Sequence, residues 1–253
     1  MSDSRRETFE VGGRPRIEVS LPSGDMVFLS GEPGKVEVDV EGRNAEDLVI
    51  EQRSGRIVLR TSDRLVSRWG SFDVTVRTPA GADVDVRAAS ADVDVKVALG
   101  SLGARLASGD IRVGEIEADA TVESASGDVE LGEVGGNLDV STASGDVMLR
   151  RAGGRVEMHT ASGEVRLGSV LAPLSVSTQR GDFEVDHYEG GDLECSSTSG
   201  DVRIGLPPGR TLDVDLNTVS GDIRSDFPPE NGEGATARLH VKTISGDIVL
   251  VRS

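Results

Sequence analysis

An 18-residue repeat is the feature that most constrains the fold of this chain. The tripeptide Ser-Gly-Asp, or a close variant of it, recurs along the chain, and its acidic residue stands at positions 92, 110, 128, 146, 164, 182, 201, 222 and 247. These positions are evenly spaced as far as 182, and the last three intervals become progressively longer. Such a period is typical of a chain built from one small unit that stacks on copies of itself.

Apolar side chains keep a fixed distance from the acidic residue. Eight residues before it stand Val84, Leu102, Ala120, Leu138, Val156, Leu174, Leu193, Val214 and Leu239. One residue after it stand Val93, Ile111, Val129, Val147, Val165, Phe183, Val202, Ile223 and Ile248. Polar residues fill most of the alternate sites, so each unit is predicted to contain two short, half-buried strands.

The Gly before the acidic residue predicts a corner between the two strands. Glycine adopts positive φ without steric cost, and Ser and Asp side chains bond to nearby backbone groups in turns. A long antiparallel meander would leave a wide apolar face uncovered, whereas a parallel solenoid buries that face inside the stack. We therefore expect an all-β, single-chain parallel β-solenoid of about 18-residue coils, right-handed by the general preference for right-handed crossovers.

Residues 1–83 follow the same pattern less regularly. Apolar residues stand at the expected distances before Ser23-Gly24-Asp25 and Ser54-Gly55-Arg56, namely Ile17, Val19 and Leu21 in the first case and Leu48 and Ile50 in the second. Segment 60–71, which carries the only Trp, breaks the register. We expect residues 1–83 to form a degenerate β region that caps the stack, and residues 84–253 to form the regular repeats.

Composition and charge exclude several classes of partner. Aromatic residues make up only 3% of the chain, so Val, Leu, Ile and Ala must build a thin core that leaves little room for a ligand cavity. The formal net charge of −17 repels nucleic acid and anionic lipid surfaces, so we expect neither nucleic-acid binding nor direct membrane insertion. Mimicry of nucleic acid by an acidic protein remains an alternative, supported by charge alone.

The first residues, "MSDSRRETFEVGG", carry no apolar stretch after the two arginines and so do not resemble a secretory signal. No segment approaches the roughly 20 apolar residues that cross a bilayer. Cys195 is the only cysteine, which excludes an internal disulfide framework, and it occupies an apolar site where a small buried side chain is expected. A cytoplasmic location is the expectation from these features.

The sequence offers no catalytic set. The only histidines, His159, His187 and His240, are expected to be exposed strand residues, and no nucleophile elbow, phosphate loop or zinc helix motif is present. We assign no catalytic, cofactor-binding or metal-binding residue and expect no cofactor. Polysaccharide cleavage is a weak alternative, because one Trp and one Tyr cannot supply the platforms that hold sugars.

Stacked corners would bring polar side chains into rows. Asp110, Asp128, Asp146, Glu164 and Asp182 would lie about 4.8 Å apart, and their repulsion could be relieved by a bound cation or by corner amides without any ligand. A row of threonines four residues before the acidic position predicts a hydroxyl ladder, with β-branched filler as the equal alternative: Thr142, Thr160, Thr178, Thr218 and Thr243.

The sequence also carries the integrin-recognition tripeptide, as Arg180-Gly181-Asp182. Gly181 and Asp182 fill the same corner sites as the other repeats, and Phe183 fills the usual apolar site, so we interpret the motif as a repeat unit. Arg180 replaces the Ser of the preceding corners. A salt bridge from Arg180 to a carboxylate of a neighbouring coil is our expectation for it.

The motif "TASGDV", the 18-residue spacing and the closing segments "LDVDLNTVSGDIRSDFPPE" and "ARLHVKTISGDIVLVRS" resemble a bacterial β-strand-repeat family of unknown function, whose members are labelled "putative adhesin" or toast-rack domains. The resemblance covers nearly the whole chain. It implies a β-solenoid-like, non-enzymatic domain, and it offers no catalytic residues. Some members are attached to membrane segments and linked to envelope-stress signalling.

We therefore expect a non-catalytic structural or protein-interaction scaffold with an unidentified protein partner. Its expected contact surfaces are the acidic corners and the long loops at 205–210 and 227–237. Self-assembly is the alternative, because the final strand "IVLVRS" is predicted to offer an unpaired edge for a homo-oligomer through the terminal coils.

Overall fold

A computed structural model describes residues 3–43, 45–61, 70–209, 212–227 and 237–253. In these residues the chain is all-β, with one short 3₁₀ helix, η1 (Ala45–Asp47), and no helix long and apolar enough to span a bilayer. The strands are β1 (Asp3–Glu10), β2 (Arg16–Ser23), β3 (Met26–Ser30), β4 (Lys35–Gly42), β5 (Leu48–Arg53), β6 (Arg56–Thr61), β7 (Phe72–Thr78), β8 (Ala82–Ser90), β9 (Val93–Val95), β10 (Leu99–Ser108), β11 (Ile111–Ile116), β12 (Ala120–Ser124), β13 (Val129–Val134), β14 (Leu138–Ser144), β15 (Val147–Ala152), β16 (Val156–Ser162), β17 (Val165–Val170), β18 (Leu174–Arg180), β19 (Phe183–Tyr188), β20 (Leu193–Ser199), β21 (Val202–Leu206), β22 (Leu212–Ser220), β23 (Ile223–Ser225), β24 (Ala237–Ser245) and β25 (Ile248–Arg252).

The chain divides into two compact units, Met1–Leu131 and Gly132–Ser253. In unit 1, one layer of paired strands runs β5-β6-β2-β8-β10-β12 and the other runs β1-β4-β7-β3-β9-β11. The pairs β5–β6, β1–β4 and β4–β7 are antiparallel, and the other pairs are parallel. These antiparallel strands form the irregular N-terminal cap that the sequence predicts.

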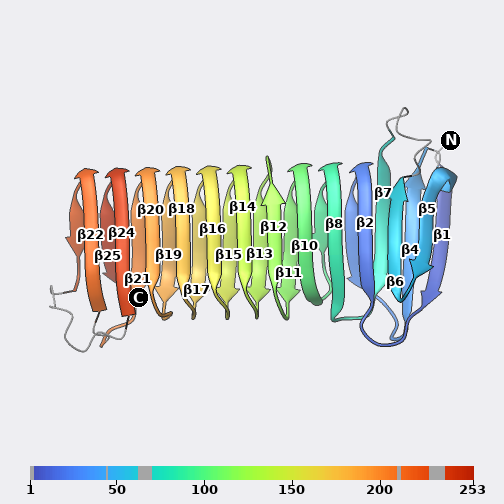
Figure 1. The fold of residues 1–253 in the computed structure, drawn as a ribbon, viewed down its shortest axis with the longest axis horizontal. Coiled ribbons are helices and arrows are strands. Elements are labelled where there is room, and N and C mark those ends of the chain that lie inside the picture. The colour runs from blue at the N-terminus through green and yellow to red at the C-terminus, as the bar shows by residue number, and fades with distance from the viewer. Residues whose placement is uncertain (1–2, 44, 62–69, 210–211, 228–236) are drawn as a thin grey trace. The chain divides into compact units, whose positions relative to one another are not determined.

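Unit 2 consists of parallel coils, each with one strand in either layer (Figure 1). One layer contains β14-β16-β18-β20-β24-β22 and the other β15-β17-β19-β21-β25-β23. Residues one repeat apart pair directly, as Leu138 does with Val156 and Val156 with Leu174. The parallel solenoid is therefore confirmed, and the antiparallel meander is not formed.

The apolar register of the sequence forms the core. Val156 and Val165 are 0% and 1% exposed, and the largest side chains of unit 2, Tyr188 and Phe183, are equally buried between the layers. Burying an aliphatic side chain of this kind stabilises the fold by roughly 1.5–3 kcal/mol. Because each coil places the same residue types over those of its neighbour, the core is continuous along each unit.

The corner glycines are required both by conformation and by space. Gly163 has φ +128°, and a Cβ atom there would lie 2.0 Å from the backbone oxygen of Gly145 in the preceding coil. An L-residue at this site would therefore be strained and would also push the coils apart.

The order of coils in space differs from the order in sequence at two places. In unit 1, the coil β2/β3 lies between β6/β7 and β8/β9. In unit 2, the coil β24/β25 lies between β20/β21 and β22/β23. The prediction that the final strand offers an unpaired edge is thus wrong, because β25 pairs on both sides. The free edges of unit 2 belong to β22 and β23.

The Ser54-Gly55 sequence does not form a solenoid corner. Its strands β5 and β6 pair antiparallel, so the prediction that residues 48–56 repeat the stacking unit is wrong, although Leu48 and Ile50 are buried as expected. Ser54 and Gly55 both have positive φ, +50° and +79°. Two consecutive residues of this kind make a tight hairpin turn, whereas the solenoid corners have positive φ at Gly alone.

Side chains of unit 1 close the edges of β1 and β5. The Arg5 guanidinium donates to the Leu48 carbonyl oxygen at 2.7 Å, and the Gln52 amide donates to the Glu10 carbonyl oxygen at 3.0 Å. Strand β1 itself, "DSRRETFE", carries five charged residues out of eight. Charged side chains of this density protect an edge strand from pairing with another chain.

Candidate binding groove

Corner aspartates bond to the backbone of neighbouring coils. Their Oδ1 atoms accept the backbone N–H of the equivalent residue one coil away: Asp92 from Asp110 (2.9 Å), Asp110 from Asp128 (3.0 Å), Asp146 from Glu164 (2.8 Å), Asp182 from Asp201 (2.8 Å), Asp201 from Asp247 (2.8 Å) and Asp247 from Asp222 (2.8 Å). The amides offset the repulsion within the row, so a cation is not needed to explain it.

The hydrogen bonds from the corner amides favour the ionised form of the carboxylates, as Asp110 shows. The hydrogen bond from the Asp128 backbone N–H, and secondarily the Arg112 guanidinium 2.8 Å away, lower the pKa of the Asp110 carboxyl against the opposing effect of desolvation. In the part of the chain that the structure describes, no group of three or more His, Cys, Asp or Glu side chains could hold a metal ion. The hydrogen bonds between its carboxylates and the amides of neighbouring coils give the acidic row a structural role.

The predicted hydroxyl row is present as a buried stack. Thr142 pairs with Thr160, which pairs with Thr178, and each is at most 7% exposed. The hydroxyls of Thr142 and Thr160 donate to backbone oxygens two residues later in their own corners, at 3.2 and 3.3 Å. These two hydroxyls thus satisfy local backbone groups, whereas the buried hydroxyl of Thr178 has no hydrogen-bond partner among the described residues.

The histidines lie on the surface, as expected. His159 contacts Glu157 (3.3 Å) and His240 contacts Asp215 (2.9 Å). His187 contacts the Ser253 hydroxyl at 2.7 Å through Nδ1 and Glu189 at 2.9 Å through Nε2, an order of groups that resembles a nucleophile, base and acid. These side chains are exposed on a strand face, where water competes for every hydrogen bond, so the contact alone does not make a catalytic site.

Cys195 is completely buried, as its apolar position in the repeat predicts. Desolvation raises the pKa of its thiol to about 12. The thiolate is the reactive form of cysteine, so this side chain packs as an inert apolar group.

The Arg180-Gly181-Asp182 tripeptide is an ordinary corner. Gly181 has the same positive φ as the other corner glycines, and the Asp182 carboxylate accepts the Asp201 backbone N–H at 2.8 Å. The expected salt bridge of Arg180 is wrong, because no carboxylate of the described residues lies within ion-pair distance of its guanidinium. A presented integrin ligand would need Asp182 free, and its carboxylate is already engaged.

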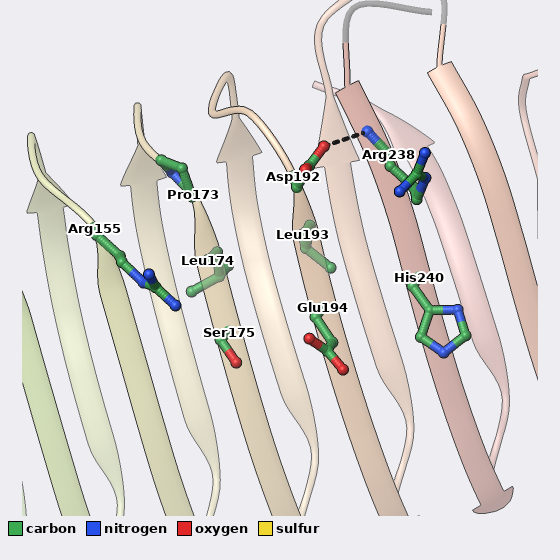
Figure 2. Close-up of a pocket in the computed structure, with 9 residues that line it drawn as sticks. All are labelled: Arg155, Pro173, Leu174, Ser175, Asp192, Leu193, Glu194, Arg238 and His240. Atoms are coloured by element: carbon green, nitrogen blue, oxygen red, sulfur yellow. Dashed lines mark hydrogen bonds between the residues drawn. The ribbon is translucent and has the colours of Figure 1, made fainter. Parts of the chain in front are cut away.

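A groove on the outer face of unit 2, over β16, β18, β20 and β24, is the strongest candidate for a binding site (Figure 2). Its volume is about 440 Å³. It is lined by Arg155, Pro173, Leu174, Ser175, Asp192, Leu193, Glu194, Arg238 and His240.

One small hydroxyl side chain, Ser175, lies on the floor of the groove. Across the sheet, Glu157, Ser175, Glu194 and His240 are paired in one row. In the next row, which lies beside the groove, Ser177 and Ser196 stand between His159 and Lys242. The Ser196 hydroxyl donates weakly to that of Ser177, at 3.4 Å.

Polar contacts orient the side chains on one wall of the groove. The Arg238 guanidinium contacts Asp213 at 3.3 Å, and its backbone N–H donates to the Asp192 carboxylate at 3.0 Å. The Nδ1 atom of His240 contacts the Asp215 carboxylate at 2.9 Å.

Two charges in the groove remain available. Among the described residues, neither the Arg155 guanidinium nor the Glu194 carboxylate has an ion-pair partner. Figure 2 shows the Arg155 side chain pointing toward the strand of Ser175, with Glu194 between Ser175 and His240. Two strand spacings separate the strands of Arg155 and Glu194, which is about 10 Å. The groove thus offers one cation, one anion and the Ser175 hydroxyl.

The corresponding depression in unit 1, about 350 Å³, has most of its charges paired internally. Arg14 contacts Asp83 at 2.7 Å, and Arg56 contacts Glu18 at 2.7 Å. Its acidic and basic groups are therefore less available to a ligand than those of the unit 2 groove.

The predicted contact surfaces and the groove do not coincide. Residues 210 and 228–236 of the predicted recognition loops lie outside the described residues. The sequence analysis did not predict the groove, because Arg155, Glu194 and Arg238 come together only when the neighbours across the sheet are known.

The family model of Toastrack DUF4097 matches residues 2–156 and 154–251, which together span nearly the whole chain. This chain belongs to the Toastrack DUF4097 family. The predicted resemblance is thereby confirmed. No curated protein matches this Toastrack chain.

Solved structures with similar folds come from Parabacteroides and Bacteroides species. A "putative lipid binding protein" from Parabacteroides distasonis ATCC 8503 has 16% identity and a TM-score of 0.51, with 99% of this chain and 97% of that chain covered. A "putative adhesin" from the same organism has 12% identity and a TM-score of 0.46, with 98% and 97% covered. Another "putative adhesin", from Bacteroides fragilis NCTC 9343, has 13% identity and a TM-score of 0.43 over the same shares. At 16% identity, the likeness to the first of these structures concerns the fold alone.

Proposed function

We propose that this Toastrack chain is a non-catalytic interaction scaffold that binds a protein partner in the unit 2 groove. The observation that carries the proposal is the pair of charges without an ion-pair partner among the described residues, Arg155 and Glu194, on either side of the strand that carries Ser175. An extended polar segment with one acidic and one basic side chain about 10 Å apart would complement both charges.

The shape and chemistry of the groove favour a polypeptide over other ligands. None of the nine lining residues is Phe, Tyr or Trp, so the groove lacks the large stacking surfaces that hold sugars. Its two leucines, Leu174 and Leu193, are buried beneath the sheet surface, so little apolar area faces a lipid tail. The Ser175 hydroxyl and the charged groups suit the donors and acceptors of an extended chain.

Charge reversal tests the proposal. Native partners are captured with the full-length protein after cross-linking in its own cells, for the wild type, Arg155→Glu and Glu194→Lys. Each single reversal is expected to deplete the same partner at least about tenfold, because each leaves one charge of the partner unmatched. Arg150→Glu, on the opposite layer and likewise without an ion-pair partner among the described residues, is the matched control and should retain it.

An unchanged partner set in both groove variants would overturn the proposal. Deletion of residues 228–236 distinguishes recognition by the loop from recognition by the groove. If the deletion variant retains the partner, the groove is supported. If the deletion variant loses the partner and the charge-reversal variants retain it, recognition belongs to the loop.

Fractionation of the same cells checks the proposed cytoplasmic location, which recovery of the protein with membranes would contradict.

The absence of catalysis is also part of the proposal. The exposed Ser253, His187 and Glu189 contact provides an arrangement to test. A fluorophosphonate probe, which labels activated serines, is expected to leave Ser253 unmodified. Labelling that disappears in His187→Ala would show an activated hydroxyl and contradict the non-catalytic assignment.

A further inference from the structure

We propose that the end coil of unit 2, formed by β22 and β23, is a docking surface for a second copy of this chain, which binds through the same coil and makes a two-fold dimer. This interface goes beyond the proposed groove function. The interface uses residues outside the groove, and its test needs no protein other than this chain.

Both strands of the end coil have a free side. Within the described residues, β22 pairs only with β24, and β23 pairs only with β25. Strand β22 spans nine residues, Leu212–Ser220, so a long row of backbone N–H and C=O groups is left unpaired. An edge of this kind is a template for pairing with another strand.

Apolar side chains that point inward elsewhere are uncovered at this coil. Val214 and Ile223 are 38% and 45% exposed, whereas Leu239 and Ile248, their counterparts in the adjoining coil, are completely buried. An uncapped coil necessarily leaves its inward residues half-exposed. A partner that covers Val214 and Ile223 must place one strand beside β22 and another beside β23. An equivalent coil does this.

A second apolar feature has no such structural origin. Three residues before the corner acid, the regular coils carry alanine, as at Ala143 and Ala161, but the end coil carries Val219. The Val219 side chain is 79% exposed. It contributes little to the core, so its burial in an interface would explain the choice of a large apolar residue there.

The end coil carries little of the negative charge of the chain. Residues 212–225 contain three acidic side chains and one Arg, 1 − 3 = −2, while the whole chain carries −17. The acids at the edge are paired locally, Asp213 with Arg238 at 3.3 Å and Asp222 with Arg224 at 3.4 Å. Two copies that repel each other elsewhere could meet here without bringing unpaired like charges together.

The surface that binds the end coil is the β22/β23 coil of a second copy, and not the β1 or β5 edge of unit 1. The edges of unit 1 are β1, with its five charges, and β5, whose Leu48 carbonyl oxygen already accepts Arg5. Pairing there would disrupt these bonds. Two identical β22/β23 coils instead pair antiparallel about a two-fold axis, which closes the assembly as a dimer and stops further growth.

Sedimentation of the full-length protein over a range of concentrations tests the dimer. The wild type is expected to pass from the monomer mass of 26.5 kDa to twice that mass. Val219→Lys combined with Ile223→Lys should raise the dissociation constant at least about tenfold, since the charges would be buried in the interface. Met148→Lys is the matched control: Met148 is 41% exposed on another strand, and its replacement should leave the dimer intact.

A monomer at all concentrations up to about 100 µM would overturn the proposal. So would equal dissociation constants for the wild type and the double variant, provided that both show the same far-UV circular dichroism. Val219→Lys alone adds a second variant whose folding is not in doubt, because that side chain is almost fully exposed.

Thiol protection tests which surface is used. Since Cys195 is buried and its pKa is raised to about 12, an introduced cysteine is the only reactive thiol in the described residues. Val219→Cys is expected to react more slowly with maleimide as the protein concentration rises, whereas Thr8→Cys on β1 should react at a constant rate. Protection of Thr8→Cys, or masses that grow beyond the dimer, would indicate head-to-tail assembly and contradict the two-fold model.

Discussion

At the scale of single residues, the corner row has one irregular member. Glu164 replaces aspartate in the row, and its longer side chain turns to Arg166 instead of accepting the backbone N–H of the next coil. In the described residues no hydrogen bond joins the Asp182 N–H to the Glu164 carboxylate, whereas the aspartates on either side accept theirs. The side-chain length at the corner thus decides whether adjacent coils are bonded.

Glu164→Asp is therefore expected to stabilise the protein. The shorter carboxylate reaches the Asp182 N–H, and a new hydrogen bond of this kind contributes about 0.5–1.5 kcal/mol. Urea unfolding followed by circular dichroism measures the change. Glu133→Asp, an exposed site outside the corner row, is the control and should have no effect, so an equal gain in both variants would contradict the explanation.

The lowered pKa of Asp110 predicts a pH dependence. A carboxyl whose pKa is lower in the folded state contributes stability above its unfolded pKa, near 3.8, and loses it as the pH falls through the folded value. Asp110→Asn keeps an acceptor for the Asp128 N–H but cannot titrate. Its free energy of unfolding should fall less steeply than that of the wild type below about pH 4. Parallel curves for the two proteins would show that Asp110 does not contribute.

At the scale of elements, one sequence motif serves two structures. Ser-Gly forms a solenoid corner at Gly163 and a hairpin turn at Gly55, and the two sites differ in their surroundings. A Cβ at Gly163 would collide with the Gly145 oxygen, while a Cβ at Gly55 would meet no atom within 4 Å. Stacking against a neighbouring coil is therefore what makes the corner glycine irreplaceable.

The same substitution should separate the two cases. Gly55→Ala is expected to cost about 1 kcal/mol, because only the positive φ is unfavourable. Gly163→Ala should cost more than about 3 kcal/mol or prevent folding, because the collision with backbone adds to the same strain. The free energies of unfolding from urea titration compare them, and similar losses at both sites would contradict the role of close coil packing.

At the scale of the whole chain, position in sequence does not report position in the stack. Coil β24/β25 is nearest the end of the chain but is paired on both sides, whereas β22/β23, earlier in the sequence, has a free edge. The exposed fractions agree, since β22 contains mostly exposed residues and β24 alternates regularly. Local stability should follow the stack and not the sequence.

Hydrogen exchange can detect this order. Amides of residues 237–252 are expected to exchange at least about tenfold more slowly than those of residues 212–225, because opening an interior coil breaks pairing on two sides. Mass spectrometry of peptides from the full-length protein gives both rates. It should be done at low protein concentration, where a dimer through β22/β23 would not add protection. Faster exchange in 237–252 would contradict the observed strand order.

The sequence by itself determined the coil. The 18-residue period, the apolar sites eight before and one after the acid, and the Gly at the corner predict two strands and a turn, and they do so because alternation and backbone freedom are local properties. The buried threonine row and the burial of Cys195 follow from the same register. These features needed no knowledge of which coils are neighbours.

Only the tertiary structure decided which coils touch. In sequence order β22 would follow β20, and Asp213 and Asp215 would form the wall of the groove; the insertion of β24 places Arg238 and His240 there instead. The free edge moved from β25 to β22/β23 for the same reason. All coils carry nearly the same apolar register, so any of them can stack on any other, and the repeat alone cannot choose between the two orders. That choice depends on contacts between residues far apart in the chain, and it determines both the charge of the candidate groove and the strands left to bind another molecule.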